Sequence, residues 1–420
     1  MTASAGQSRS RFGGFAAARA LVRGESGRAR CWAPAPVPFD AAAGGCRREM
    51  RRLSVSEAQP GEPCGRETDA AAPAAAVSAQ VGPRAAAEWG AGKSQNMSAH
   101  GEFRIPAALQ PKAGDYAYDL ERALTSVVSL SSRVPAEAFT AETLGTERAG
   151  NGVVIREDGL VLTIGYLVLE AESVWLTTHD GRSVPAHVVG YDGETGFGLV
   201  QALGRLGLPA LRLGRSDTLK VGERAVIAGA GGRSHSLAVE LVARQEFAGY
   251  WEYVLDDALF TTPAHPHWGG TALIGPDGAL VGIGSLQLQQ GGTGAGRAIN
   301  MVVPIELLPP ILTDLETRGR ADRPPRPWLG LYATETEDGV VVMGTADRGP
   351  AEAADLRAGD VLTEVAGEPV ADLAGFFRQV WALGEAGVRV PLTVNRDGRL
   401  TRLALTSVDR ERFLIGPKLH

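Results

Sequence analysis

Two short stretches combine the side chains that nucleophilic or metal chemistry needs. Ser234, His235 and Ser236 are consecutive, and a serine becomes a nucleophile when an imidazole takes its proton. Adjacent residues on a strand point to opposite faces, so nearness in sequence alone does not make a hydrogen bond. We therefore expect a polar surface loop here. A displaced nucleophile–base pair is the alternative.

The second stretch holds His265 and His267, two positions apart. On a strand both imidazoles would face the same way and could bind a metal ion, but a zinc site needs at least three protein ligands. No third ligand follows nearby, so we expect a loop packed over a cleft. The sequence predicts no metal and no cofactor.

These residues lie within a long β-rich region. Short alternating apolar runs begin at residue 149 and are joined by Asp-Gly pairs at 158–159, 180–181 and 277–278. Asp-Gly supplies the positive φ angles of a tight hairpin. Strands at this spacing predict a barrel or a sandwich, and the region extends to about Val303. We expect a helix over 115–131, from its apolar spacing, and another over 304–318 that Pro309-Pro310 interrupts.

A smaller unit follows a polar, Pro-rich linker at 319–327. It shows five short strand patterns, at 328–334, 339–344, 361–366, 388–395 and 400–406. A helical pattern lies at 371–383. The fold class is therefore mainly β, with a second domain of the α+β type over 328–412.

The order of several motifs resembles one family. They are a hairpin at 152–159, strands around 180–182 and 188–192, a Leu-Gly-Arg-Ser-Asp link at 213–217, and a Gly-Gly pair at 269–270 followed by Gly-Ala-Leu-Val-Gly-Ile at 278–283. Over roughly 150–410 the chain resembles the HtrA (DegP-like) family of trypsin-like serine proteases with a C-terminal PDZ domain. The resemblance implies a trypsin-like double β-barrel over 115–318, followed by a PDZ domain.

The resemblance also implies where a catalytic triad would lie. Tyr166 stands in the place of the family's His, Gly196 in that of its Asp and Trp268 in that of its Ser. Pro266, which has no N–H, stands where the family has an oxyanion-hole donor. Hydrolysis needs a nucleophile, a base and an orienting carboxylate. We therefore expect a pseudoprotease that is not an enzyme. The alternative is an active trypsin-like serine endopeptidase in protein quality control.

The C-terminal domain keeps its family's landmarks. Residues 349–362 resemble the PDZ stretch G-P-A-x-x-A-G-L-x-x-G-D-x-I, with Asp355 in place of a Gly. The loop 328–331 resembles the one that presents backbone N–H groups to a peptide's terminal carboxylate. The expected partners are protein or peptide C termini, bound by an adaptor or regulatory scaffold. The expected peptide-binding residues are Trp328, Leu329, Gly330, Leu331, Leu373, Phe376, Phe377 and Val380.

The first hundred residues differ in composition from the rest. Residues 1–96 hold all three Cys and a net charge of +5, whereas the whole chain carries −6. They lack a sustained apolar pattern, which predicts a disordered extension over 1–100, with Met97 as an alternative start. We see no signal peptide, so the expected location is cytoplasmic, with a periplasmic alternative. Mild acidity argues against a nucleic-acid partner, and no apolar stretch is long enough to span a membrane.

The family often trimerises through the segment before its first barrel. The resemblance therefore implies a possible homo-oligomer, a trimer, through the segment around Tyr116 and Tyr118, or assembly with active relatives. These tyrosines could instead pack on their own domain.

Overall fold

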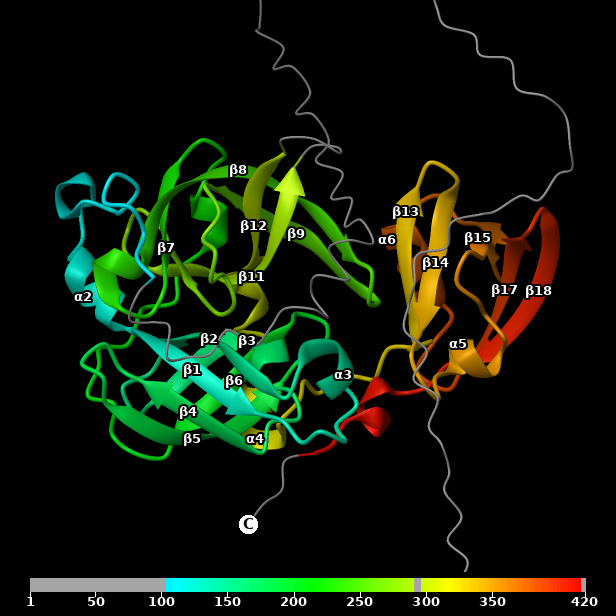
Figure 1. Cartoon of the computed structure of the whole chain (residues 1–420), viewed down its shortest axis with the longest axis horizontal. Coiled ribbons are helices and arrows are strands. Elements are labelled where there is room, and N and C mark those ends of the chain that lie inside the picture. Colours follow the sequence, from blue (N-terminus) through cyan, green and yellow to red (C-terminus); the bar gives the residue numbers. More distant parts are fainter. Residues whose placement is uncertain (1–102, 291–295, 417–420) are drawn as a thin grey trace, which may run out of the picture. The chain divides into compact units, whose positions relative to one another are not determined.

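The computed structural model describes residues 103–290 and 296–416 (Figure 1). The extension predicted as disordered, including Met97, lies outside the described residues. Among the described helices, none is both long and apolar enough to span a membrane.

The first six strands close into a barrel in the order β1-β2-β3-β6-β5-β4. Closure leaves no sheet edge unpaired and buries one face of every strand. The strands are β1 (Val127–Arg133), β2 (Glu147–Val154), β3 (Leu160–Ile164), β4 (Ser173–Thr177), β5 (Ser183–Tyr191) and β6 (Phe197–Ala202). Two short helices border this barrel, α2 (Leu120–Thr125) and α3 (Ala141–Leu144).

A second closed barrel follows, in the order β10-β11-β12-β9-β8-β7. Its strands are β7 (Arg224–Ala228), β8 (Ser236–Gly249), β9 (Tyr253–Thr262), β10 (Ala272–Ile274), β11 (Leu280–Gln290) and β12 (Arg297–Pro304). The β8–β9 hairpin is long, and its last paired residues are Gly249 and Tyr253. The turn 250–252 therefore stands at the tip of a paired two-stranded arm.

The C-terminal domain is one sheet in the order β13-β14-β15-β17-β18, with β16 paired to β15. Its strands are β13 (Leu331–Thr336), β14 (Gly339–Thr345), β15 (Val361–Val365), β16 (Glu368–Pro369), β17 (Arg389–Arg396) and β18 (Arg399–Thr406). Its helices are α5 (Pro350–Ala353) and α6 (Leu373–Ala382). Within this sheet β13 is an edge strand, so its outer N–H and C=O groups pair with no other strand of the sheet.

Several sequence predictions are confirmed. The fold is mainly β, with two barrels followed by the smaller α+β domain. Gly159, Gly181 and Gly278 have positive φ angles of 95°, 84° and 76°, as their Asp-Gly turns require. Asp355 has a φ of 59°, the left-handed conformation expected where relatives carry Gly. The helix predicted at 304–318 is split into η6 (Ile305–Leu307) and α4 (Leu312–Arg318) around the two prolines.

The helix predicted over 115–131 is wrong at both ends, because only residues 120–125 are α-helical. Asp119 caps α2 by accepting a 3.0 Å bond from the Arg122 backbone N–H, but α2 ends at Thr125 and β1 begins at Val127. β-branched valines at 127–128 suit a strand, and β1 pairs with both β2 and β4 to close the barrel. Tyr118 packs against the Gly278 turn of the same chain.

Candidate functional site

The positions assigned to a triad lie where the two barrels face each other. Tyr166 is on the short 3-10 helix η3 (Gly165–Leu167) after β3, and its hydroxyl donates to the Ser285 carbonyl at 2.9 Å. Its pKa is raised above the usual value by burial and lowered in part by a hydrogen bond with the Trp268 side chain. The structure thus brings Tyr166 and Trp268 together. Gly196, with a φ of 82°, accepts at its carbonyl the Gly165 N–H at 2.6 Å.

The loop that carries Trp268 is fixed by His265 and two asparagines. The Asn151 amide donates to the carbonyls of His267 and Gly269 at 3.1 and 3.0 Å. The Asn300 side chain accepts the His265 N–H at 2.6 Å. The loop between β9 and β10 is therefore held from both barrels.

The imidazole of His265 is fully engaged. Its Nδ1 accepts the His267 backbone N–H at 3.1 Å, so Nε2 carries the proton and donates to the His235 carbonyl at 3.0 Å. Burial lowers the His265 pKa to about 4, so the ring is neutral at pH 7 and positions the loop. Among the described residues, no group of three or more His, Cys, Asp or Glu is arranged to hold a metal ion.

One hydroxyl does lie beside an imidazole. Ser234 Oγ and His235 Nδ1 are 3.0 Å apart in η5 (Gly232–His235), and His235 Nδ1 is also 3.2 Å from the Gly231 carbonyl. The pair lies in a turn, consistent with the polar loop expected from the sequence. Within the Ser234-His235-Ser236 stretch, this contact between Ser234 Oγ and His235 Nδ1 joins a hydroxyl to an imidazole.

The predicted carboxylate loop of the PDZ domain already holds a carboxylate. The backbone N–H groups of Leu329, Gly330 and Leu331 donate to the side chain of Glu252, at 2.7 to 3.2 Å. Gly330 has a φ of 70°, which turns its N–H toward the same point as its neighbours. A cluster of convergent N–H groups is an anion site. The sequence did not single out Glu252 as a partner of this loop.

The other predicted groove residues form the wall behind this loop. Leu373, Phe376 and Val380 of α6 are buried in one cluster with Leu329 and Leu331. Phe377 is buried too and stacks on Trp381, with ring centroids 5.8 Å apart. Trp328 is buried, and its ring is tilted against that of Phe413, with ring centroids 5.0 Å apart. These side chains serve as core, so a peptide would meet the sheet edge and loop in front of them.

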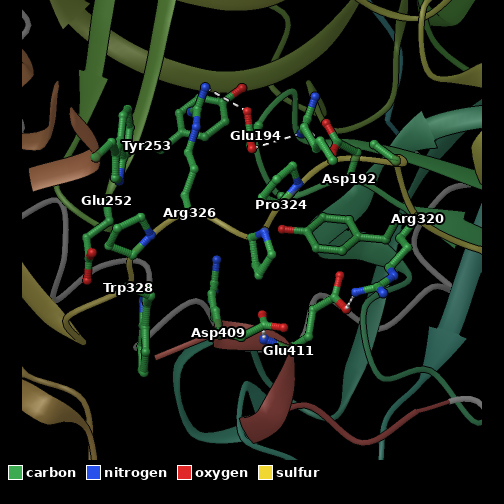
Figure 2. Close-up of a pocket in the computed structure, with 18 of the residues that line it drawn as sticks. Asp192, Glu194, Glu252, Tyr253, Arg320, Pro324, Arg326, Trp328, Asp409 and Glu411 are labelled. Atoms are coloured by element: carbon green, nitrogen blue, oxygen red, sulfur yellow. Dashed lines mark hydrogen bonds and ion pairs between the residues drawn. The ribbon is translucent and has the colours of Figure 1, made fainter. Parts of the chain in front are cut away.

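A cavity of about 130 Å³ lies beside Glu252 (Figure 2). The linker lines it through Arg323 and Arg326, which pair with Glu194 at 2.8 and 2.6 Å. Burial raises the pKa of Glu194. The Arg326 guanidinium also lies 4.4 Å from the centre of the Trp381 ring. The linker is thus tied by ion pairs to the first barrel and by a cation–π contact to α6.

Comparison with known proteins identifies both folded parts. Residues 150–283 match the trypsin-like peptidase domain, and residues 327–406 match the PDZ domain. A "Probable periplasmic serine endoprotease DegP-like" of Pseudomonas fluorescens is 28% identical over 274 residues, 61% of this chain and 55% of the relative. A protein of the same name from Chlamydia pneumoniae is 26% identical over 270 residues, 61% of this chain and 54% of the relative. The chain thus spans about half the length of these curated relatives.

A solved structure described as "HtrA-type protease AlgW with decapeptide" covers 71% of this chain and 98% of its own, at 21% identity and a TM-score of 0.44.

Two expectations are corrected by these relatives. The prediction that the chain is not an enzyme is contradicted, because the relatives are named serine endoproteases. That prediction rested on three matched positions and gave little weight to groups elsewhere, such as Ser234 and His235. The cytoplasmic location is also contradicted, because the same relatives are named periplasmic. It rested on not finding an export signal, and a missing pattern is weak ground for a location.

The chain therefore carries a trypsin-like peptidase domain followed by a PDZ domain, and it is similar to proteins named DegP-like.

Proposed function

We propose that this chain is a periplasmic HtrA-type protein whose PDZ domain binds the C termini of polypeptides. The observation that carries the proposal is the convergence of three consecutive backbone N–H groups, from Leu329 to Leu331, on one carboxylate. An anion site next to the open edge of β13 suits an extended peptide that ends in a carboxylate. The proposed domains span 115–318 and 328–412, joined by the linker at 319–327.

A peptide pool tests this proposal directly. Decapeptides with four randomised C-terminal residues would be made with free or amidated C termini and titrated against the full chain. We expect the free acids to bind at least tenfold more tightly, because hydrogen bonds to a charged group contribute about 1.5–3 kcal/mol. Equal binding of both pools would refute recognition of the terminal carboxylate.

Endoproteolysis of the bound polypeptide is the second candidate function. The names of the relatives favour it. Tyr166, Gly196 and Trp268 fill the matched positions, so the hydroxyl–imidazole contact to test is Ser234 with His235 at 3.0 Å. Hydrolysis of unfolded casein that disappears in Ser234→Ala would support it. Labelling by a fluorophosphonate probe would locate any reactive serine, and unchanged hydrolysis in Ser234→Ala would exclude this pair.

The assembly is a further part of the proposal. The segment around Tyr116 and Tyr118 would support a trimer or assembly with active relatives, and light scattering on the full chain measures it. A mass equal to one chain would contradict self-assembly.

A further inference from the structure

The turn 250–252 binds the PDZ site as a peptide would. Glu252 Oε1 accepts from Leu329, Gly330 and Leu331 at 3.2, 2.7 and 3.2 Å, and Oε2 accepts from Leu329 at 3.0 Å. The three N–H groups of residues 329–331 are thus all engaged by one side chain. A terminal carboxylate and the carboxyl group of this side chain offer the same two oxygens to the loop, so only one of them can occupy it.

The main chain of the turn also bonds to β13, as the main chain of a bound peptide would. The Ala333 N–H, on the open edge of β13, donates to the Tyr250 carbonyl at 3.1 Å. Tyr250 lies two residues before Glu252, and Ala333 lies two residues after Leu331. The turn therefore runs antiparallel to β13, in the register of an added strand.

Helix α6 also contacts the β8–β9 arm, through Arg378. Arg378 pairs with Glu246 of β8 at 2.5 Å and also with Asp256 of β9. Val254 of β9 is buried in the PDZ core cluster with Leu329 and Phe376. The tip of the β8–β9 arm is thus held between the sheet edge and the helix.

The backbone at Glu252 carries a conformational cost. Its φ is 62°, the left-handed region that a residue with a Cβ rarely adopts. Tight hairpin turns usually place Gly, Asn or Asp at such a position. Residues held there against preference cluster at binding sites and switches.

We propose that Glu252 and its turn are an intramolecular occupant of the peptide site, so that a polypeptide C terminus binds only when the β8–β9 tip leaves the loop. This regulation rests on the proposed function. Tethered to the same chain, the turn competes at a high effective concentration. The apparent affinity for a peptide then equals the intrinsic affinity multiplied by the fraction of molecules in which the turn has left the site.

Proton binding tunes this competition. Burial raises the pKa of Glu252 to about 7 against the opposing effect of the three N–H bonds and of Arg410. Tyr332 on β13 is a further ionisable group near it. The cavity beside it is lined by the ionisable residues Tyr191, Asp192, Glu194, Tyr253, Arg320, Arg323, Arg326, Asp409, Arg410 and Glu411. A solvent-exposed Glu titrates near 4.5, so the docked turn takes up a proton between the two values. Protonation of Glu252 therefore stabilises the docked turn. This stabilisation is complete below pH 4.5 and is lost as the pH rises through 7.

We expect peptide affinity to fall about tenfold when the pH is lowered from 8 to 6. The carboxylate of the free peptide is ionised over this whole range. Titrations of the wild-type full chain at each pH measure the effect, and Glu252→Gln should flatten it. A slope that persists in Glu252→Gln would contradict the assignment to this carboxylate.

The deciding experiment removes the carboxylate without disturbing the turn. Glu252→Gly suits the φ of 62° and should fold, and Glu252→Gln keeps the side-chain shape. The full chain with each variant is titrated with the free-acid decapeptide pool. We expect at least tenfold tighter binding for Glu252→Gly and a smaller gain for Glu252→Gln. Amide hydrogen exchange at residues 329–331 should also be faster in peptide-free Glu252→Gly than in the wild type.

The outcomes separate the two proposals. If wild type and Glu252→Gly bind the free acids equally, the intramolecular occupant is refuted and C-terminal recognition stands. If neither discriminates free from amidated peptides, the proposed function fails, and this inference fails with it. Unchanged exchange at residues 329–331 in Glu252→Gly would also refute docking.

Discussion

Gly330→Val should cost the PDZ domain at least tenfold in affinity for free-acid peptides. Gly330 has a φ of 70°, and a Cβ there would lie 2.9 Å from the Trp328 ring. A β-branched side chain would push the backbone out of the left-handed region. The N–H groups of residues 329–331 would then no longer point to one place. Losing one or two charge-assisted hydrogen bonds corresponds to about 1.5–3 kcal/mol each.

The matched control for this loss is Gly367→Ala. Gly367 also has a positive φ, 90°, but no atom lies within 4 Å of a Cβ added there, and it is in the turn between β15 and β16. We expect this variant to lose some stability and to keep its peptide affinity. Calorimetric titration of both variants measures the difference. Equal affinities for Gly330→Val and wild type would contradict the assignment of the carboxylate loop.

Gly270→Ala should destabilise the barrels by about 4 kcal/mol or more. A Cβ on Gly270 would lie 1.9 Å from the Asn151 carbonyl oxygen and 2.6 Å from Thr163 Oγ1. These two atoms are hydrogen-bonded to each other at 2.7 Å inside the first barrel, so neither can move aside. The φ of 75° adds a conformational cost of about 1–2 kcal/mol. Losses of this size come from few mechanisms, and overpacking is one of them.

Gly181→Ala is the control for Gly270→Ala, because it carries the cost of a positive φ without a steric clash of the new Cβ. Gly181 has a φ of 84° and no atom within 4 Å of the added Cβ. We expect a loss of about 1 kcal/mol there, so denaturant unfolding should place the two variants about 3 kcal/mol apart. Similar losses in both would mean that the contact between the loop after Trp268 and β2 is looser than described.

Local chemistry made much of the fold predictable. Asp-Gly pairs set the hairpins because a tight turn needs positive φ at fixed positions. Pro309 and Pro310 divided a helix because proline lacks the N–H that a helix interior uses. The helix expected over 115–131 failed from Val127 onward, where pairing with β2 and β4 outweighs the helical spacing. Such long-range pairing leaves little trace in the segment itself.

In the candidate site, too, a local feature could be predicted from the sequence and a long-range contact could not. The carboxylate loop at 328–331 could be proposed because its residues, Gly330 among them, resemble a local stretch of PDZ domains. Glu252 could not, since it lies 77 residues from Leu329 along the chain. The signal that remained was a glutamate flanked by Trp251 and two tyrosines, at a turn where small polar residues are usual. A search for such turns beside a peptide-binding domain would have raised it as a candidate.

The most direct measurement follows the amide resonances of residues 329–333 in the full chain during a titration with a free-acid decapeptide. We expect the largest shift changes at Leu329, Gly330, Leu331 and Ala333, and we expect the amidated peptide to leave these signals unchanged. Shift changes that are the same for both peptides, or that centre on another part of the chain, would contradict this expectation.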